Sequence, residues 1–157
     1  KEFGKECTRC NRCCELDSAL FMEEDVKRVA QHFGMTREDF IEHFTVPHER
    51  FNTKLWKAKQ IKQGKPYGKC IFLDDQYGCS IHEIKPQYCQ VCSTKSARGT
   101  ELVLWFALNY LVNPNDPESI RQWAQYLQHH PTIPGGELNN LVPDKDKLRR
   151  MLDYEML

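Results

Sequence analysis

The sequence predicts an α+β fold that is mainly helical, with a small cysteine-rich core and a short hairpin packed against C-terminal helices. Three observations predict this class: clustered cysteines in the first 92 residues, apolar residues at three-to-four-residue spacing in most other segments, and one turn-rich stretch between two short apolar runs. The chain has 157 residues, and a single domain typically takes about 100–200 residues. Its 40% hydrophobic and 28% charged composition excludes a wholly disordered chain.

Residues 15–44 are expected to form two helices. Val26, Val29 and Phe33 follow a helical rhythm, and Gly34 is a typical stop after Phe33. Thr36 precedes two acidic residues, as an N-cap does at the start of a second helix. This segment is therefore interpreted as a helical pair that packs beside the cysteines.

Residues 45–69 differ in charge from the segment before them. Seven basic residues and no acidic ones lie between positions 50 and 69, whereas segment 15–42 holds eight acids and three bases. The formal net charge of zero therefore sums two segments of opposite sign. We favour a solvated, extended edge guarded by lysines over a binding strip for an anionic partner.

Residues 70–82 predict a hairpin, with strands on either side of a turn-rich connection at 74–78. The two strands would bring Cys70 and Cys79 near each other. Pro86 suits the first turn of a short helix that carries Cys89, and Cys92 follows about one turn later.

The remainder predicts a helical scaffold. Residues 100–112 are apolar on nearly all sides, Asp116 starts a further helix, and Asp144 caps a last one. Residues 131–143 are rich in Pro and Gly and are expected to be a loop. His129 and His130 stand at a helix end, where a cation suits the helix dipole, and receive no chemical role.

The cysteines fall into two groups with metal-ligand spacing. C-x2-C occurs three times, which lets two thiolates turn toward one ion, and C-x2-C-x2-C can supply three corners of a cubane iron–sulfur cluster. The predicted metal ligands are Cys7, Cys10, Cys13, Cys14, Cys70, Cys79, Cys89 and Cys92. We expect a single domain over 1–157, with the cysteine-cluster metal-binding core in 3–95 and a helical extension in 100–157.

Cys13 and Cys14 raise the question of how many centres there are. Adjacent residues of an extended chain point to opposite sides, so they suit two neighbouring sites, or one of them is spare. In the two-centre hypothesis, Cys7, Cys10 and Cys13 take one distant partner and Cys14 joins the rest of the second group. Spacing does not separate zinc from a 4Fe–4S cluster; the three closely spaced thiolates favour iron–sulfur.

The cysteines also allow two simpler interpretations, a set of reduced core thiols or a set of disulfides. Reduced core cysteines behave as small hydrophobic residues, and disulfides are rare in reducing compartments. Eight clustered thiols fit either of these less well than a metal. His82, three residues after Cys79, is interpreted as a second-shell or structural residue.

Targeting signals are also missing from the sequence. Its longest apolar run, 102–112, is too short to span a bilayer, and the N-terminus shows no signal peptide. We expect the cytoplasm or another reducing compartment. The chain starts at Lys1, so an upstream segment is not excluded. Zero net charge argues against a nucleic-acid partner, although the basic strip at 50–69 leaves this open.

The combined cysteine pattern resembles the CxxCxxCC, or YkgJ-like, family of zinc- or iron-chelating domains. The matching elements are C-x2-C-x2-C-C at 7–14, C-x-F-L at 70–73, G-C-x-I-H at 78–82 and K-P-x-x-C at 85–89. The resemblance covers about residues 3–95 and implies chelation through the cysteines. The chain departs from it at Lys85, where many members have Arg, and at 90–93, where many have Arg-x-aromatic-Pro.

Three classes of function follow. The first is a metal- or iron–sulfur-binding accessory, redox or maturation component of a larger protein complex. The second is a cluster-dependent enzyme, either an oxidoreductase or a transferase, since some proteins resembling the family are linked to protein lysine methylation. The third is a zinc-stabilised interaction module. No nucleotide-binding, HExxH or GxSxG motif is present, so the sequence leaves catalysis undecided.

Overall fold

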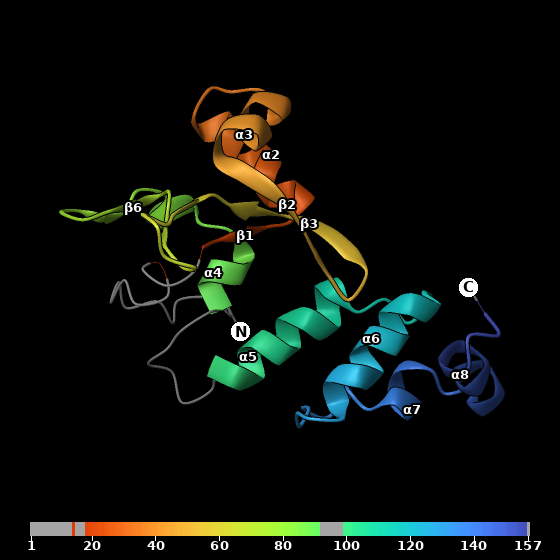
Figure 1. Cartoon of the computed structure of the whole chain (residues 1–157). Helices are drawn as coiled ribbons and strands as arrows, with labels where there is room; N and C mark the ends of the chain where they lie inside the picture. Colours follow the sequence, from red (N-terminus) through yellow and green to blue (C-terminus); the bar gives the residue numbers. More distant parts are fainter. Residues whose placement is uncertain (1–13, 15–17, 92–98, 157) are drawn as a thin grey trace. The chain divides into compact units, whose positions relative to one another are not determined.

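The computed structural model describes residue 14 and residues 18–91 and 99–156, and these form an α+β structure with more helix than strand (Figure 1). The fold class is as predicted. Residues divide into two compact units: 1–48 with 55–99, and 49–54 with 100–157. The single-domain organisation stays a prediction.

The first unit begins with strand β1 (Leu20–Phe21) and helices α2 (Glu23–His32) and α3 (Arg37–Phe44). Strands β2 (Thr45–Arg50) and β3 (Thr53–Ala58) follow. β1 pairs antiparallel with β3, with Leu20 opposite Lys57, and the sheet order is β1-β3-β2. The helical pair predicted for 15–44 is therefore confirmed as α2 and α3, although Leu20 and Phe21 within that range form a strand.

Local chemistry explains where α2 ends and where α3 begins. Gly34 adopts φ +66° after α2, a backbone conformation that favours glycine. The Thr36 hydroxyl accepts the Asp39 backbone N–H at 3.1 Å and caps α3 as predicted. Glu23 and Arg37 form a salt bridge between the two helices, which holds the pKa of Glu23 below its usual value.

The remaining elements of the first unit are short. β4 (Gln60–Ile61) pairs with β5 (Lys69–Cys70), and β6 (Leu73–Asp74) pairs with β7 (Gly78–Cys79). A 3-10 helix, η1 (His82–Ile84), leads to α4 (Gln87–Val91). The predicted hairpin exists over 73–79, but Cys70 belongs to the neighbouring strand pair, because residue 70 pairs with Gln60.

An aromatic core holds the first unit together. Phe21, Phe40 and Phe72 are buried, and their ring centroids lie 5.5–6.2 Å apart. Val26 and Val29 of α2 are fully buried on the same cluster. Removing one such Phe side chain typically costs about 3–5 kcal/mol.

The second unit is helical. It contains α5 (Gly99–Phe106), a π-helix η2 (Ala107–Leu111), α6 (Pro117–Leu127), α7 (Leu138–Leu141) and α8 (Lys145–Leu152). The carboxylates of Asp116 and Asp144 accept backbone N–H groups at the starts of α6 and α8, as predicted. The predicted loop at 131–143 contains the four-residue helix α7. Fully buried Trp123, Ile120 and Met151 form part of its core.

The tip of the β2–β3 hairpin, residues 49–54, belongs to this second unit. Phe51 and Asn52 both have positive φ, +50° and +59°. Such a conformation suits Asn or Gly at a tight hairpin but costs a bulky residue about 1–2 kcal/mol. Packing offsets that cost, because the Phe51 ring lies edge-to-face against Trp123 at 5.2 Å.

Within the part of the chain that the structure describes, no helix combines the length and apolar character needed to cross a bilayer.

Candidate metal centre

Four of the eight predicted ligands lie within the described residues, and they come from four separate segments. Cys14 is the last residue of the first cysteine group, Cys70 ends β5, Cys79 ends β7, and Cys89 lies in α4. Cys7, Cys10, Cys13 and Cys92 lie outside the described residues. The first C-x2-C-x2-C run and the final C-x2-C pair therefore stay sequence predictions.

The four described cysteines share one apolar environment. Cys70 is 4% exposed and belongs to the core cluster that contains Phe72 and Ile81. The other three are half-buried and pack against that same cluster. Segments separated by more than 50 residues thus bring thiols to the border of one core.

A close strand crossing positions Cys70. A Cβ placed on Gly68 would lie 2.2 Å from the Ile61 carbonyl oxygen and 2.7 Å from the Lys62 Cα. Only glycine therefore permits β4 and β5 to approach this closely. The Ile71 backbone N–H then donates to the Lys59 carbonyl at 2.9 Å, which extends the strand contact past Cys70.

A small hairpin positions Cys79. The Asp74 carboxylate accepts the backbone N–H groups of Gln76 and Tyr77, both at 2.8 Å, and closes the turn. These two hydrogen bonds hold the pKa of Asp74 below its ordinary value, and the bond from Tyr77 has the larger effect. Beyond Cys79, the Ser80 hydroxyl and N–H both donate to the Phe72 carbonyl.

A buried carboxylate positions the helix that carries Cys89. Asp25, 4% exposed, accepts the Met22 N–H at 2.9 Å and the Gln87 N–H at the start of α4 at 3.3 Å. Arg28 pairs with Asp25 at 3.2 Å and donates to the Ile84 and Lys85 carbonyls at 3.2 and 3.0 Å. These contacts join α2 to the segment that immediately precedes α4.

Sequence reasoning missed the positioning role of Asp25 and Arg28. In the sequence, Asp25 is one of several acids in an acidic segment, and its place in the first turn of a helix indicates a cap of that helix alone. Gln87 lies 62 positions away, so no local pattern indicates the second bond. The tertiary fold creates it.

The donor set suits a soft metal. Thiolates are preferred by zinc and by iron–sulfur clusters, and apolar walls of the kind formed by Phe72 and Ile81 restrict solvent access to such a centre. Within residues 14, 18–91 and 99–156, however, no group of three or more Cys, His, Asp or Glu side chains is placed closely enough to hold an ion. Which cysteines share a metal thus stays a prediction.

The basic strip is distributed over strands and loops. Lys62 and Lys65 are exposed beyond β4, Lys65 lies 5.7 Å from the Tyr67 ring centroid, and Lys69 pairs with Asp75 at 3.0 Å. The segment is extended in β2, β3 and β4, but β3 is the central strand of its sheet and residues 62–68 form no strand, so only part of the predicted extended edge is present. Its use by a partner stays a prediction.

A family model matches residues 6–109, which is 104 of the 157 positions. It is described as "CxxCxxCC: Putative zinc- or iron-chelating domain". No curated protein and no solved structure gives a significant match to the chain.

Proposed function

Because the chain belongs to the CxxCxxCC family of zinc- or iron-chelating domains, we propose that its cysteines bind 4Fe–4S clusters, and that the eight thiols serve two centres. The family supports chelation of zinc or iron. The choice of iron–sulfur rests on the C-x2-C-x2-C spacing at 7–13, which supplies three closely spaced thiolates.

One observation carries the proposal. Cys14, Cys70, Cys79 and Cys89 reach one apolar core from four different segments, although more than 50 residues separate the first from the second. Each of the last three is held by a local device, namely the Gly68 crossing, the Asp74 turn and the Asp25 bridge. Metal ligands are typically oriented by surrounding residues in this way.

The chain's own residues would supply ligands and exclude water. Thiolates from the two cysteine groups would hold iron, and the cluster, when bound, supplies a one-electron redox couple. The apolar side chains of Phe72 and Ile81 would limit solvent access on their side, which influences the reduction potential. His82 follows Cys79 by three residues and begins η1. We propose that its imidazole orients a ligand and does not itself bind the metal.

A role within a larger assembly completes the proposal. The chain carries no nucleotide or other cofactor fingerprint beside its cysteines, so we propose an accessory, redox or maturation component with a protein partner. The alternative is a zinc-stabilised interaction module, which would contain zinc in place of iron and sulfide.

The test is purification without oxygen, followed by an absorption spectrum and quantification of iron, acid-labile sulfide and zinc. Brown protein with about four iron and four sulfide per cluster supports the proposal. Colourless protein with stoichiometric zinc would replace iron–sulfur by the zinc alternative. Protein that binds neither metal and holds four disulfides would overturn both.

Matched variants separate loss of a ligand from loss of folding. Cys89→Ser removes a thiol from α4, and we expect it to lower metal content. Val91→Ala removes buried apolar volume from the same short helix, where Val91 is 1% exposed, and leaves every thiol in place. Equal metal loss in both variants would show that metal content follows helix stability and not the Cys89 sulfur.

A further inference from the structure

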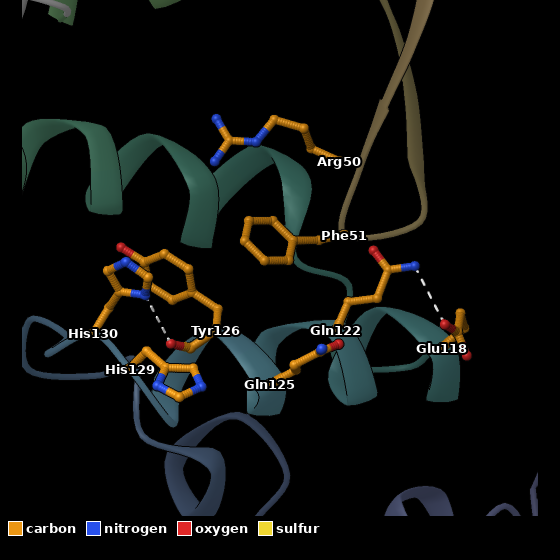
Figure 2. A pocket seen from close by; sticks show the side chains of 8 residues that line it. All are labelled: Arg50, Phe51, Glu118, Gln122, Gln125, Tyr126, His129 and His130. Atoms are coloured by element: carbon orange, nitrogen blue, oxygen red, sulfur yellow. Dashed lines mark hydrogen bonds between the residues drawn. The ribbon is translucent and has the colours of Figure 1, made fainter.

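A groove in the second unit lies outside the cysteine-bearing segments. It has a volume of about 530 Å³ and is bordered by the hairpin tip and by α6 with the turn that follows it (Figure 2). This volume falls within the range of about 300–1,000 Å³ that is usual for small-molecule sites. The metal proposal leaves the groove unused.

The wall formed by the hairpin tip is held in place by specific contacts. The Asn52 backbone N–H donates to the Gln122 side-chain oxygen at 3.0 Å, and the Asn52 amide donates to Asp116 at 2.7 Å. The strained backbone of Phe51 places its ring, 9% exposed, edge-on to Tyr126 with 6.0 Å between centroids. Strain of this kind persists where the surroundings impose it, and it clusters at binding sites.

Flat aromatic surfaces line the other wall. Tyr126 and His130 stack with centroids 4.3 Å apart and planes inclined by 7°, and Tyr126 also stacks on Trp123 at 5.0 Å. His130 is exposed, so the stack ends at the groove with a ring open to solvent. Such a surface suits a planar ring, which gains stacking energy without needing a particular edge pattern.

Positive charge borders the same space. The Arg50 guanidinium lies 5.6 Å from the Phe51 ring centroid and, in Figure 2, extends toward the side of Tyr126 and His130. In the described part of the chain, no carboxylate lies within ion-pair distance of Arg50. The groove's acid, Glu118, is already paired with Arg121 at 2.9 Å. A guanidinium without an acidic partner suits a carboxylate or phosphate.

We propose that this groove binds a small planar anion, an aromatic or heteroaromatic ring that carries a phosphate or a carboxylate. The ring stacks on the open face of His130, and the anionic group pairs with Arg50. The amide of Gln125, an exposed side chain that lines the groove, is available to hydrogen-bond a polar ring edge. This proposal does not depend on the metal centre.

Calorimetric titration of the full, metal-loaded chain tests it with AMP, benzoate, adenosine and inorganic phosphate. AMP binding at least about tenfold more tightly than adenosine or phosphate supports a phosphate-bearing ligand, and preferred binding of benzoate supports a carboxylate. Absence of saturable binding at millimolar AMP and benzoate overturns the proposal. So does AMP binding no tighter than phosphate alone, since the ring would then contribute nothing.

Three variants, each checked for unchanged metal content and helical signal, separate the two halves of the site. Arg50→Gln should weaken binding of the preferred anion at least about tenfold, and His130→Ala should weaken it while leaving phosphate binding as it was. Lys54→Gln is the control, because Lys54 is an exposed base in the same hairpin and does not line the groove. Equal effects of Arg50→Gln and Lys54→Gln would show that the anion responds only to the overall positive charge of the hairpin, and this would overturn the proposed site.

Discussion

Asp25 joins two segments of the first unit that lie far apart in the sequence, the start of α2 and the start of α4. Its buried carboxylate accepts one N–H from the start of α2 and another from the start of α4, and Arg28 adds bonds to two carbonyls before α4. A carboxylate that satisfies two helix starts at once stabilises a long-range junction more than a surface ion pair would.

Asp25→Asn is expected to destabilise the chain by about 2 kcal/mol, because an amide NH₂ group would face a backbone N–H donor in a buried site. Urea unfolding measures the change. Glu24→Gln is the matched control, since Glu24 is exposed in the same helical turn and should shift stability by less than about 0.5 kcal/mol. Similar losses in the two variants would remove the special role of Asp25.

Asp25 also connects stability with metal affinity. Because Gln87 and Cys89 lie in the same short helix, Asp25→Asn should also weaken metal binding, by less than the about 10- to 100-fold that is typical of losing a residue bonded directly to a ligand. Competition with a chelator at neutral pH measures this. Unchanged affinity would show that α4 keeps Cys89 in place without Asp25.

Glu137 gives the chain a pH-dependent contribution in a unit without cysteines. Its own backbone N–H, the Asn140 amide and the Gly135 N–H lower the pKa of its carboxyl. A pKa lowered on folding adds stability above the unfolded value, about 4.3, and that stability is lost as pH falls through the folded pKa. The difference in unfolding free energy between the natural chain and Glu137→Gln should therefore shrink from pH 7 to about pH 3. A constant difference across that range would contradict this assignment.

Residue-scale signals were predictable where their partners are local. Thr36, Asp116 and Asp144 cap helices through N–H groups two or three residues away, so the sequence reveals them directly. Phe51 shows the opposite case. Its left-handed backbone contradicts local preference and is maintained by contacts with Trp123 and Tyr126, about 70 positions later.

At the scale of elements, length decided what could be predicted. Helices α2, α3, α5, α6 and α8 have eight or more residues, enough to show an apolar rhythm. Strands β5, β6 and β7 have two residues each, too few to show alternation. The turn at 74–78 was recognisable from its composition. The strand that pairs with Cys70 could not be predicted, because this pairing depends on a close backbone approach for which Gly68 is the only sign in the sequence.

Gly68→Ala tests that approach. The added methyl group would collide with backbone atoms of Ile61 and Lys62, which no side-chain rotation can relieve, so β4 and β5 must separate at a cost of about 1–3 kcal/mol. Because Cys70 ends β5, metal content should fall as well. Gly64→Ala is the comparison: its φ of +81° makes alanine strained, yet no atom lies within 4 Å, so metal content should be retained. Full metal retention in Gly68→Ala would contradict the importance of this crossing.

At the scale of the whole molecule, the predicted metal ligands all belong to one of the two units. Every cysteine of the sequence falls within 1–48 and 55–99, whereas the second unit, 49–54 with 100–157, contains Trp105 and Trp123. The family match extends only to residue 109, so most of the second unit lies beyond it. The family pattern predicts metal chelation by the first unit, whereas helix periodicity and the caps Asp116 and Asp144 predict only the helices of the second unit.

Metal removal should therefore act unequally on the two units. A ligand that binds only the folded state stabilises it by RT ln(1 + [L]/Kd), about 4 kcal/mol at a thousandfold excess over Kd, and that energy belongs to the segments that hold the thiols. In Trp56→Phe the remaining tryptophans report on the second unit, while far-UV circular dichroism follows both. After anaerobic chelation we expect the dichroism transition to broaden toward lower temperature while the tryptophan transition moves less. Transitions that shift together by the same amount would show that the two units unfold as one cooperative domain, which is the organisation that the length of the chain predicts.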